Sequence, residues 1–184
     1  MRVITGIARG KNILTLSGDA LRPTASRVKE GLFSAIQFDI EGRRVLDLFA
    51  GSGQLGLEAL SRGAKEAVFV DANRDAMKII EENIASCGFQ KRAKTERMDY
   101  TAFLAKNTDM FDIVFIDPPY QSGFLNHALS KVVNFTNLGG TIICEHQIPE
   151  NLPEICGDFQ IVKQYKYGKI GLTLYRKKET AVED

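Results

Sequence analysis

From residue 43 onward, short apolar runs alternate with longer segments whose apolar residues recur at helical spacing. The runs predict buried strands and cover residues 44–49, 66–71, 93–98, 111–117 and 140–146. The segments between them predict helices and cover residues 54–62, 73–87, 100–106 and 122–134. Strands and helices that alternate in this way are typical of an α/β fold with a doubly wound, parallel sheet and right-handed crossovers.

The carboxyl-terminal end of the chain departs from this alternation. Residues 158–165 and 169–177 both have the composition of strands, and only a short turn at Tyr167-Gly168 separates them. Two strands joined so closely pair antiparallel. We therefore expect a sheet that is mostly parallel and that ends in an antiparallel hairpin.

The amino-terminal end is also distinct from the alternating region. Residues 2–8 and 12–16 predict a short β-hairpin, and a helix follows over residues 26–38. No linker separates these elements from the rest of the chain. We therefore expect one compact unit with two regions, an N-terminal extension over residues 1–42 and the main domain over residues 43–184.

The composition is that of an ordinary globular protein, because the 184 residues are 44% hydrophobic and 26% charged. Such a chain can build the core of one domain, which excludes a mainly disordered protein. No apolar run approaches the roughly 18 residues of a membrane span. The first residues also lack the apolar region of a signal peptide. We expect a cytoplasmic protein that has no membrane partner.

The spacing of cysteine and histidine predicts neither a disulfide framework nor a metal site. Cys87, Cys144 and Cys156 lie far apart and form no CxxC pair. They also have no metal-ligand spacing with His127 or His146. We expect the cysteines to be buried, reduced thiols.

Charge is unevenly distributed along the chain, although the net charge is only +1. Residues 1–29 carry six basic side chains against Asp19 alone, a balance of +5, so the remainder carries 1 − 5 = −4. The six are Arg2, Arg9, Lys11, Arg22, Arg27 and Lys29. A basic end on a nearly neutral body favours a polyanionic partner, such as a nucleic acid, at that end.

Candidate chemistry begins with a glycine-rich loop after the first strand of the alternating region. Gly51 and Gly53 allow a tight turn and the close approach of a ligand. With Gly56 the loop also matches GxGxxG, a weak signature of dinucleotide binding. Asp47, four residues before Gly51, disfavours an anionic pyrophosphate. Its carboxylate suits a cationic ligand, such as the sulfonium and amino groups of S-adenosyl-L-methionine.

The next two strands each end in an aspartate. Asp71 follows Gly51 by 20 residues, and its carboxylate can accept hydrogen bonds from both hydroxyls of an adenosine ribose. Asp99 follows the third strand and can accept a hydrogen bond from the exocyclic amine of adenine. Aspartates after strands also cap helices and turns, so the residues alone leave both interpretations open.

The fourth strand ends in Asp117-Pro118-Pro119-Tyr120, the most specific motif in the chain. The prolines fix the backbone and offer no N–H, so the free polar groups are acceptors, namely the Asp117 carboxylate and the Pro118 carbonyl. Two acceptors can hold both hydrogens of an NH₂ group and direct its lone pair at a methyl donor. Tyr120 offers a flat surface on which a base can stack.

These four features in series resemble the class I S-adenosylmethionine-dependent methyltransferases that act on exocyclic amines. Three further segments, 21–24, 27–33 and 167–176, are similar to the signature of the bacterial RsmD family. The members of that family are 16S rRNA (guanine-966-N2)-methyltransferases. The resemblance extends over nearly the whole chain.

The resemblance implies a Rossmann-like, seven-stranded sheet in the order 3-2-1-4-5-7-6 and an N-terminal hairpin that helps to hold RNA. It implies S-adenosyl-L-methionine as cofactor and 16S rRNA of the small ribosomal subunit as partner. The residues implied to line the cofactor pocket are Thr24, Asp47, Phe49, Gly51, Ser52, Gly53, Asp71, Ala72 and Asp99. The residues implied to hold the guanine are Asp117, Pro118 and Tyr120. Those expected to contact RNA are Arg9, Lys11, Arg22, Arg27 and Pro119, in a monomer that needs no metal.

Three alternatives remain open at this point. An adenine-N6 methyltransferase acting on DNA or RNA would use the same loop at Asp117, but the chain has no separate DNA-recognition domain. A non-catalytic, RNA-binding assembly factor would need the basic N-terminal segment but not both pockets. A nicotinamide-dependent oxidoreductase would explain the glycine loop and Asp71, but it would leave Asp47 and Asp117 without a role.

Overall fold

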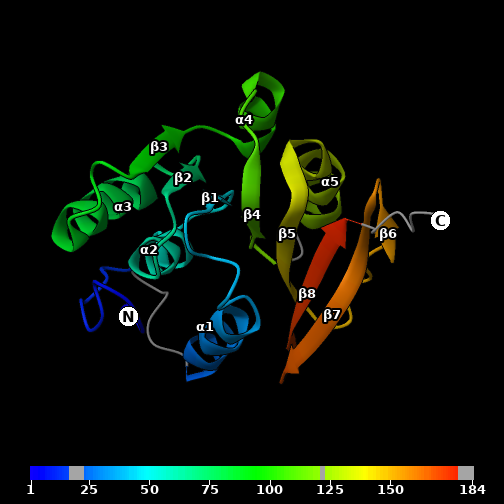
Figure 1. Cartoon of the computed structure of the whole chain (residues 1–184), viewed down its shortest axis with the longest axis horizontal. Coiled ribbons are helices and arrows are strands. Elements are labelled where there is room, and N and C mark those ends of the chain that lie inside the picture. Colours follow the sequence, from blue (N-terminus) through cyan, green and yellow to red (C-terminus); the bar gives the residue numbers. More distant parts are fainter. Residues whose placement is uncertain (17–22, 121–122, 178–184) are drawn as a thin grey trace.

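A computed structural model describes residues 1–16, 23–120 and 123–177 and has one eight-stranded sheet in the order β3-β2-β1-β4-β5-β8-β7-β6 (Figure 1). The strands are β1 (Arg44–Asp47), β2 (Glu66–Asp71), β3 (Ala93–Arg97), β4 (Phe111–Ile116), β5 (Thr136–Gln147), β6 (Ile155–Cys156), β7 (Phe159–Tyr167) and β8 (Ile170–Lys177). The first five are parallel to one another, and β8, β7 and β6 continue the sheet with antiparallel pairs that begin between β5 and β8. This confirms the predicted α/β fold and its antiparallel end.

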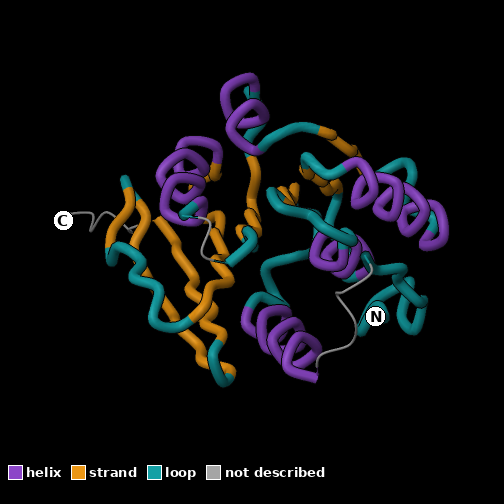
Figure 2. Tube along the Cα trace, turned by 180° about the vertical axis from the view of Figure 1, so that it is seen from behind, coloured by secondary structure: helices purple, strands orange, loops and turns teal. Residues whose placement is uncertain are grey.

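Helices cover both faces of the sheet (Figures 1 and 2). They are α1 (Pro23–Ala35), α2 (Gln54–Ser61), α3 (Arg74–Cys87), α4 (Tyr100–Lys106), α5 (Phe124–Val132) and the short 3₁₀ turn η1 (Val133–Phe135). The first three pack with one set of strand side chains, and α4 and α5 pack with the set on the other face. None of the helices in the described ranges is long and apolar enough to cross a membrane.

The local sequence pattern accounts for the order of the strands in the sheet. Apolar residues of β1 and β4 are buried on both faces, as expected for central parallel strands. The weaker pattern of β3 fits its place at the edge, where its side chains are only partly buried. The sheet has one strand more than expected, because the two residues of β6 pair with the start of β7 across a turn at Gly157. This short strand forms the edge of the sheet beyond β7.

The predicted N-terminal β-hairpin is present as a short antiparallel pairing and not as two full strands. Its two segments meet in a single antiparallel bridge between Arg2 and Asn12, and turns occupy the residues between them. A few backbone hydrogen bonds join the two segments, such as Val3 N–H to the Lys11 carbonyl at 3.0 Å and Ile13 N–H to the Met1 carbonyl at 2.8 Å. The pairing stays short because other backbone N–H groups of this arm, residues 1–16, are bound by side chains of α2 and α3. Glu58 accepts from Ile4 and Thr5, Ser61 from Ala8, and Asn83 from Leu14, at 2.8–3.0 Å.

Helix α1 begins three residues earlier than predicted. Pro23 occupies its first position, where the missing N–H of proline is tolerated. The predicted end at Phe38 is also shifted, because residues 36–38 form a turn. The helix packs Val28 and Leu32 into the same core as the arm, so the extension and the main domain share one hydrophobic cluster.

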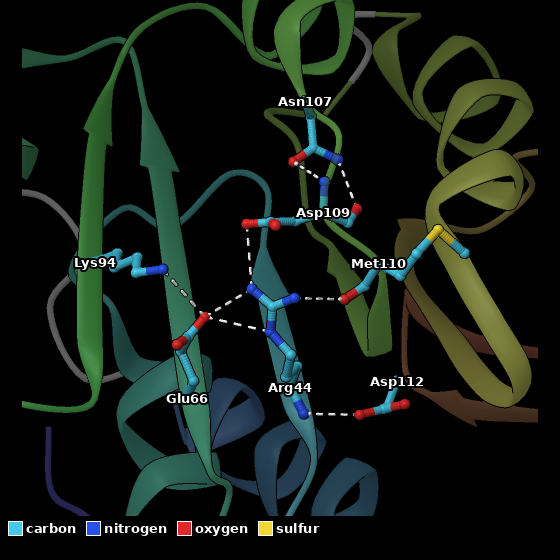
Figure 3. A network of polar contacts seen from close by, with 7 residues as sticks. All are labelled: Arg44, Glu66, Lys94, Asn107, Asp109, Met110 and Asp112. Carbon is cyan, nitrogen blue, oxygen red and sulfur yellow. Dashed lines mark hydrogen bonds and ion pairs between the residues drawn. The ribbon is translucent and has the colours of Figure 1, made fainter.

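A polar network joins the amino-terminal ends of three strands, on the edge of the sheet opposite the strands' carboxyl ends (Figure 3). Arg44 in β1 pairs with Glu66 in β2 at 2.8 Å and with Asp109 before β4 at 3.1 Å. The Arg44 backbone N–H donates to Asp112 at 2.8 Å. The guanidinium keeps the pKa of the Glu66 carboxyl below its ordinary value. These contacts hold β2, β1 and β4 together, which keeps their opposite ends in register.

Candidate active site

A cleft of about 660 Å³ opens at the carboxyl ends of β1, β2, β3 and β4. The loops that follow these strands form its walls, and Met1, Thr15 and Leu16 of the N-terminal arm complete one side. Its size is that of a site for a small molecule or cofactor. The position is where α/β sheets bind ligands, because all parallel strands end at the same edge.

The glycine loop after β1 is held by Asp71. The Gly51 N–H donates to one carboxylate oxygen of Asp71 at 2.8 Å, and the Asn73 N–H donates to the other at 2.8 Å. Gly51 and Gly53 have φ of 55° and 78°, a conformation that favours glycine. Asp71 therefore shapes the loop and lines the cleft at the same time.

The third glycine of the GxGxxG pattern serves packing. A Cβ on Gly56 would overlap the ring of Phe69 in β2, so glycine allows α2 to lie close against the sheet. The Gly56 N–H donates to Asp47 at 3.0 Å. Asp47 is only 2% exposed and lies behind the loop, outside the residues that line the cleft. Burial raises the pKa of Asp47 to about 7, with a smaller contribution from the negative charge of Asp71.

Asp99 lines the cleft and is also the N-cap of α4, so the two interpretations of this residue are compatible. Its carboxylate accepts from the backbone N–H and the hydroxyl of Thr101, and these hydrogen bonds lower its pKa. Beside it, Phe49, Tyr100 and Phe124 form an aromatic wall with ring centroids 4.9–6.4 Å apart. A polar acceptor next to an aromatic wall suits a purine ring.

Gln54 carries a polar atom that sequence reasoning missed. It begins α2 directly after the glycine loop, and it lines the cleft. Its Oε1 is buried and has no hydrogen-bond partner within the part of the chain that the structure describes. A buried acceptor without a partner is costly, so a donor on a bound ligand would relieve that cost. Its position next to Gly53 was the only signal in the sequence.

The loop Asp117-Pro118-Pro119-Tyr120 closes the other end of the cleft. Asp117 directly follows β4, Pro118 is buried, and Pro119 and Tyr120 are exposed. The Tyr120 hydroxyl donates to Oε1 of Glu145 in β5 at 3.0 Å. Burial raises the pKa of the Glu145 carboxyl, and the hydrogen bond from Tyr120 opposes this shift. Sequence reasoning missed Glu145, although it ends an apolar run as the aspartates do.

The remaining predicted residues are placed as follows. Phe49, Ser52 and Ala72 line the cleft, whereas Gly53 lies behind it at the start of α2. Arg9, Lys11 and Arg27, which were predicted to contact RNA, are exposed and lie outside the cleft lining. Thr24 lies in the first turn of α1, but its side chain is outside the described residues, and so is the whole of Arg22. Over residues 1–16, 23–120 and 123–177, no group of three or more His, Cys, Asp or Glu side chains could hold a metal ion.

Similar proteins identify the family of this chain and agree with its fold. The family model "Conserved hypothetical protein 95" matches residues 1–176. The "Putative rRNA methyltransferase YlbH" of Bacillus subtilis is 37% identical, and the match covers 97% of this chain and 100% of that protein. The "Ribosomal RNA small subunit methyltransferase D" of Escherichia coli is 30% identical, with 100% of this chain and 93% of that protein covered.

A solved structure gives the same result. The "Putative methyltransferase yhhF from Escherichia coli" is 31% identical and superimposes with a TM-score of 0.86, covering 98% of this chain and 99% of that one. The class I methyltransferase fold and the predicted resemblance are therefore confirmed. The chain belongs to the "Conserved hypothetical protein 95" family, the RsmD family of ribosomal RNA small subunit methyltransferases D, and is a methyltransferase.

Proposed function

We propose that this protein transfers the methyl group of S-adenosyl-L-methionine to the exocyclic N2 amine of a guanine in 16S rRNA of the small ribosomal subunit. One observation carries the proposal: a single cleft runs from the Asp71 carboxylate to the loop of Asp117 and Tyr120. The first end suits an adenosyl cofactor, and the second suits an amine acceptor. The names of the relatives, rRNA methyltransferases of the small subunit, supply the class of substrate.

The residues of the first end fit the cofactor. Asp71 would accept from the ribose hydroxyls, Asp99 from the adenine amine, and the unpartnered Oε1 of Gln54 from the cofactor's amino group. Ser52 and the backbone of Gly51 would lie against the rest of the molecule. When bound, the cofactor supplies an electrophilic methyl group on its sulfonium. Asp47, behind the loop, would contribute negative charge to this end when ionised.

The second end would hold the acceptor. Asp117 and the Pro118 carbonyl would accept the two N–H bonds of the guanine amine, which raises electron density on nitrogen and aims its lone pair. Tyr120 is 39% exposed, and its ring would stack on the base. A base inside a helix cannot reach such a loop, so the guanine must be looped out or flipped.

The N-terminal arm would contact the RNA backbone. Arg9 and Lys11 are exposed in the arm, and Arg27 is exposed on α1. Arginine and lysine side chains bind phosphates through charge and hydrogen bonds. Pro119 and Arg22 remain sequence predictions for this role. We further propose that the protein acts as a monomer, and a ribosomal substrate supports action in the cytoplasm.

Methyl transfer from labelled S-adenosyl-L-methionine to small subunits that lack the modification tests the proposal. We expect label in N2-methylguanosine with the wild-type protein, and none with Asp117→Ala, which should still bind S-adenosylhomocysteine. Asp158→Ala is the matched control, because Asp158 is a surface carboxylate that pairs with Lys177 and lies outside the cleft lining. Label in N6-methyladenosine, or no label in RNA despite cofactor binding, would overturn the proposal.

A further inference from the structure

A second carboxylate lies beside the acceptor loop, on the neighbouring strand. Strands β4 and β5 are parallel, and their last register pair is Ile116 with Cys144. Asp117 and Glu145 are the next residues along these two strands, and neighbouring strands lie about 4.8 Å apart. The Tyr120 hydroxyl, 3.0 Å from Glu145 Oε1, ties the end of the loop to this second carboxylate.

The packing around Glu145 does not explain why a carboxylate stands at this position. Ile143, two residues earlier, packs into the cluster that contains α1, so alternation directs Glu145 to the same face. Across the sheet its register partner is Leu172, which offers no polar side chain. Glu145 has no ion-pair partner among the residues that the structure describes, and Tyr120 is its side-chain hydrogen-bond partner there. A half-buried carboxylate without a cation is costly, which suggests a partner on the substrate.

The acceptor loop alone does not distinguish guanine from adenine. Guanine N2 and adenine N6 each carry two N–H bonds, so Asp117 and the Pro118 carbonyl can hold either amine. The neighbouring ring atom differs, because guanine N1 carries a hydrogen and adenine N1 carries a lone pair. A carboxylate next to Asp117 therefore attracts guanine and repels adenine, and repulsion of the wrong ligand is an effective source of specificity.

We propose that Glu145 accepts the N1–H of the target base and so makes the site select guanine over adenine; this inference rests on the proposed function. The hydrogen bond from Tyr120 is made to Oε1, and we assign Oε2 to the base. Glu145 is then a specificity-determining residue, next to the loop that holds the reacting amine. Its effect on the choice of base is separate from any effect on cofactor binding.

Replacement of the target guanine by 2-aminopurine tests the inference, because 2-aminopurine keeps the exocyclic amine but has no N1–H. It also lacks the O6 carbonyl, so the role of Glu145 is measured by how its replacement changes the preference between the two bases. We would measure kcat/KM on reconstituted small subunits that carry either base. For the wild-type protein we expect guanine to be favoured by about 10- to 100-fold, the effect of one hydrogen bond to a charged group. Glu145→Gln should lower the rate on guanine and bring this ratio close to one.

Tyr120→Phe is the matched control, because it removes the hydroxyl that binds Glu145 and keeps the aromatic ring. This variant should be slower than the wild-type protein and still prefer guanine. If both variants kept the wild-type ratio, Glu145 would act only by positioning Tyr120, and the inference would be wrong. Equal use of both bases by the wild-type protein would overturn it without any variant.

The two proposals fail in different ways. Wild-type protein that forms N2-methylguanosine but uses both bases equally would contradict the role of Glu145 alone. Wild-type protein that binds S-adenosylhomocysteine and methylates no guanine would overturn the proposed function, and the role of Glu145 with it.

Discussion

The backbone N–H of Gly51 donates to a carboxylate oxygen of Asp71 at 2.8 Å, across 20 residues of sequence. This hydrogen bond joins the loops that follow β1 and β2, two neighbouring parallel strands. The other oxygen of Asp71 accepts the Asn73 N–H at 2.8 Å. One carboxylate thus sets the shape of the glycine loop and faces the cleft.

Replacement of Asp71 by alanine should weaken the binding of S-adenosylhomocysteine by about 10- to 100-fold, because a charged acceptor is removed and the loop is released. Isothermal titration measures this directly. Asp75→Ala is the control, since Asp75 is an exposed aspartate nearby that pairs only with Lys78 among the described residues. Equal affinities of the two variants would contradict the role given to Asp71.

Asp47 should make the stability of the protein depend on pH. Its pKa is about 7 in the folded protein, against 3.8 for an ordinary aspartate. Between these values the unfolded chain loses the proton and the folded chain keeps it. The free energy of unfolding therefore falls as pH rises from about 4 to 7, because only the unfolded chain releases the proton of Asp47 over that range. Above pH 7 the contribution of Asp47 to stability is at its lowest.

The variant Asp47→Asn cannot ionise, so it isolates this effect. We expect its free energy of unfolding, relative to the wild-type protein, to rise by about 2–3 kcal/mol between pH 5 and pH 8. Urea unfolding at both pH values measures the difference. A difference that stays constant over this range would show that Asp47 is already ionised in the folded protein at pH 5.

Glu58 should be essential for the stability of the N-terminal arm. Its side chain is 0% exposed, and it accepts from Ile4 and Thr5 of the arm and pairs with Lys29 at 3.1 Å. Glu58→Ala leaves the Lys29 ammonium buried without its partner, so we expect a loss of about 3–5 kcal/mol in unfolding free energy. The arm should also become sensitive to protease.

Two comparisons test the explanation for Glu58. Glu96→Ala breaks a surface pair with Lys106 and should cost less than about 1 kcal/mol. The double variant Lys29→Met with Glu58→Leu should recover part of the stability, because the Lys29 ammonium is no longer left buried and unpaired. Arg62, which is 15% exposed, still loses its 2.9 Å pair with Glu58 in this variant. If the double variant were as unstable as Glu58→Ala, the hydrogen bonds of Glu58 to the arm and its pair with Arg62 would outweigh the unpaired charge of Lys29.

Arg9 and Lys11 should contribute to RNA binding by pairing with phosphates. Changing either to glutamine should weaken binding to small subunits and lower the salt-dependence slope by about one for each phosphate that is no longer neutralised. The affinity for S-adenosylhomocysteine should not change, because neither residue lines the cleft. Lys131→Gln removes an exposed lysine from α5, on the other face of the sheet, and is the control. If Lys131→Gln weakened binding to small subunits by the same amount, the effect would reflect the overall charge of the protein and not a specific contact.

Much of the fold was predictable from local pattern. The bounds of β2 and α4 agree with the prediction at every residue, because β2 is a continuous apolar run with an acidic residue at each end and Asp99 caps the start of α4. The edge strand β6 could not be predicted, since two residues carry no periodicity. The N-terminal hairpin pairs over fewer residues than predicted, because several of its backbone N–H groups are bound by side chains about 55–70 positions away, which no local pattern contains.

The sequence by itself determined which carboxylates meet at the cleft. Asp71, Asp99 and Asp117 each follow a parallel strand, and such strands end at one edge whatever their detailed packing. Tertiary structure alone decided that Asp47 lies behind the loop, that Gln54 has an unpartnered oxygen among the described residues, and that Glu145 meets Tyr120. These relationships depend on strand register and helix position, which arise from long-range packing between segments that the chain brings together only when it folds.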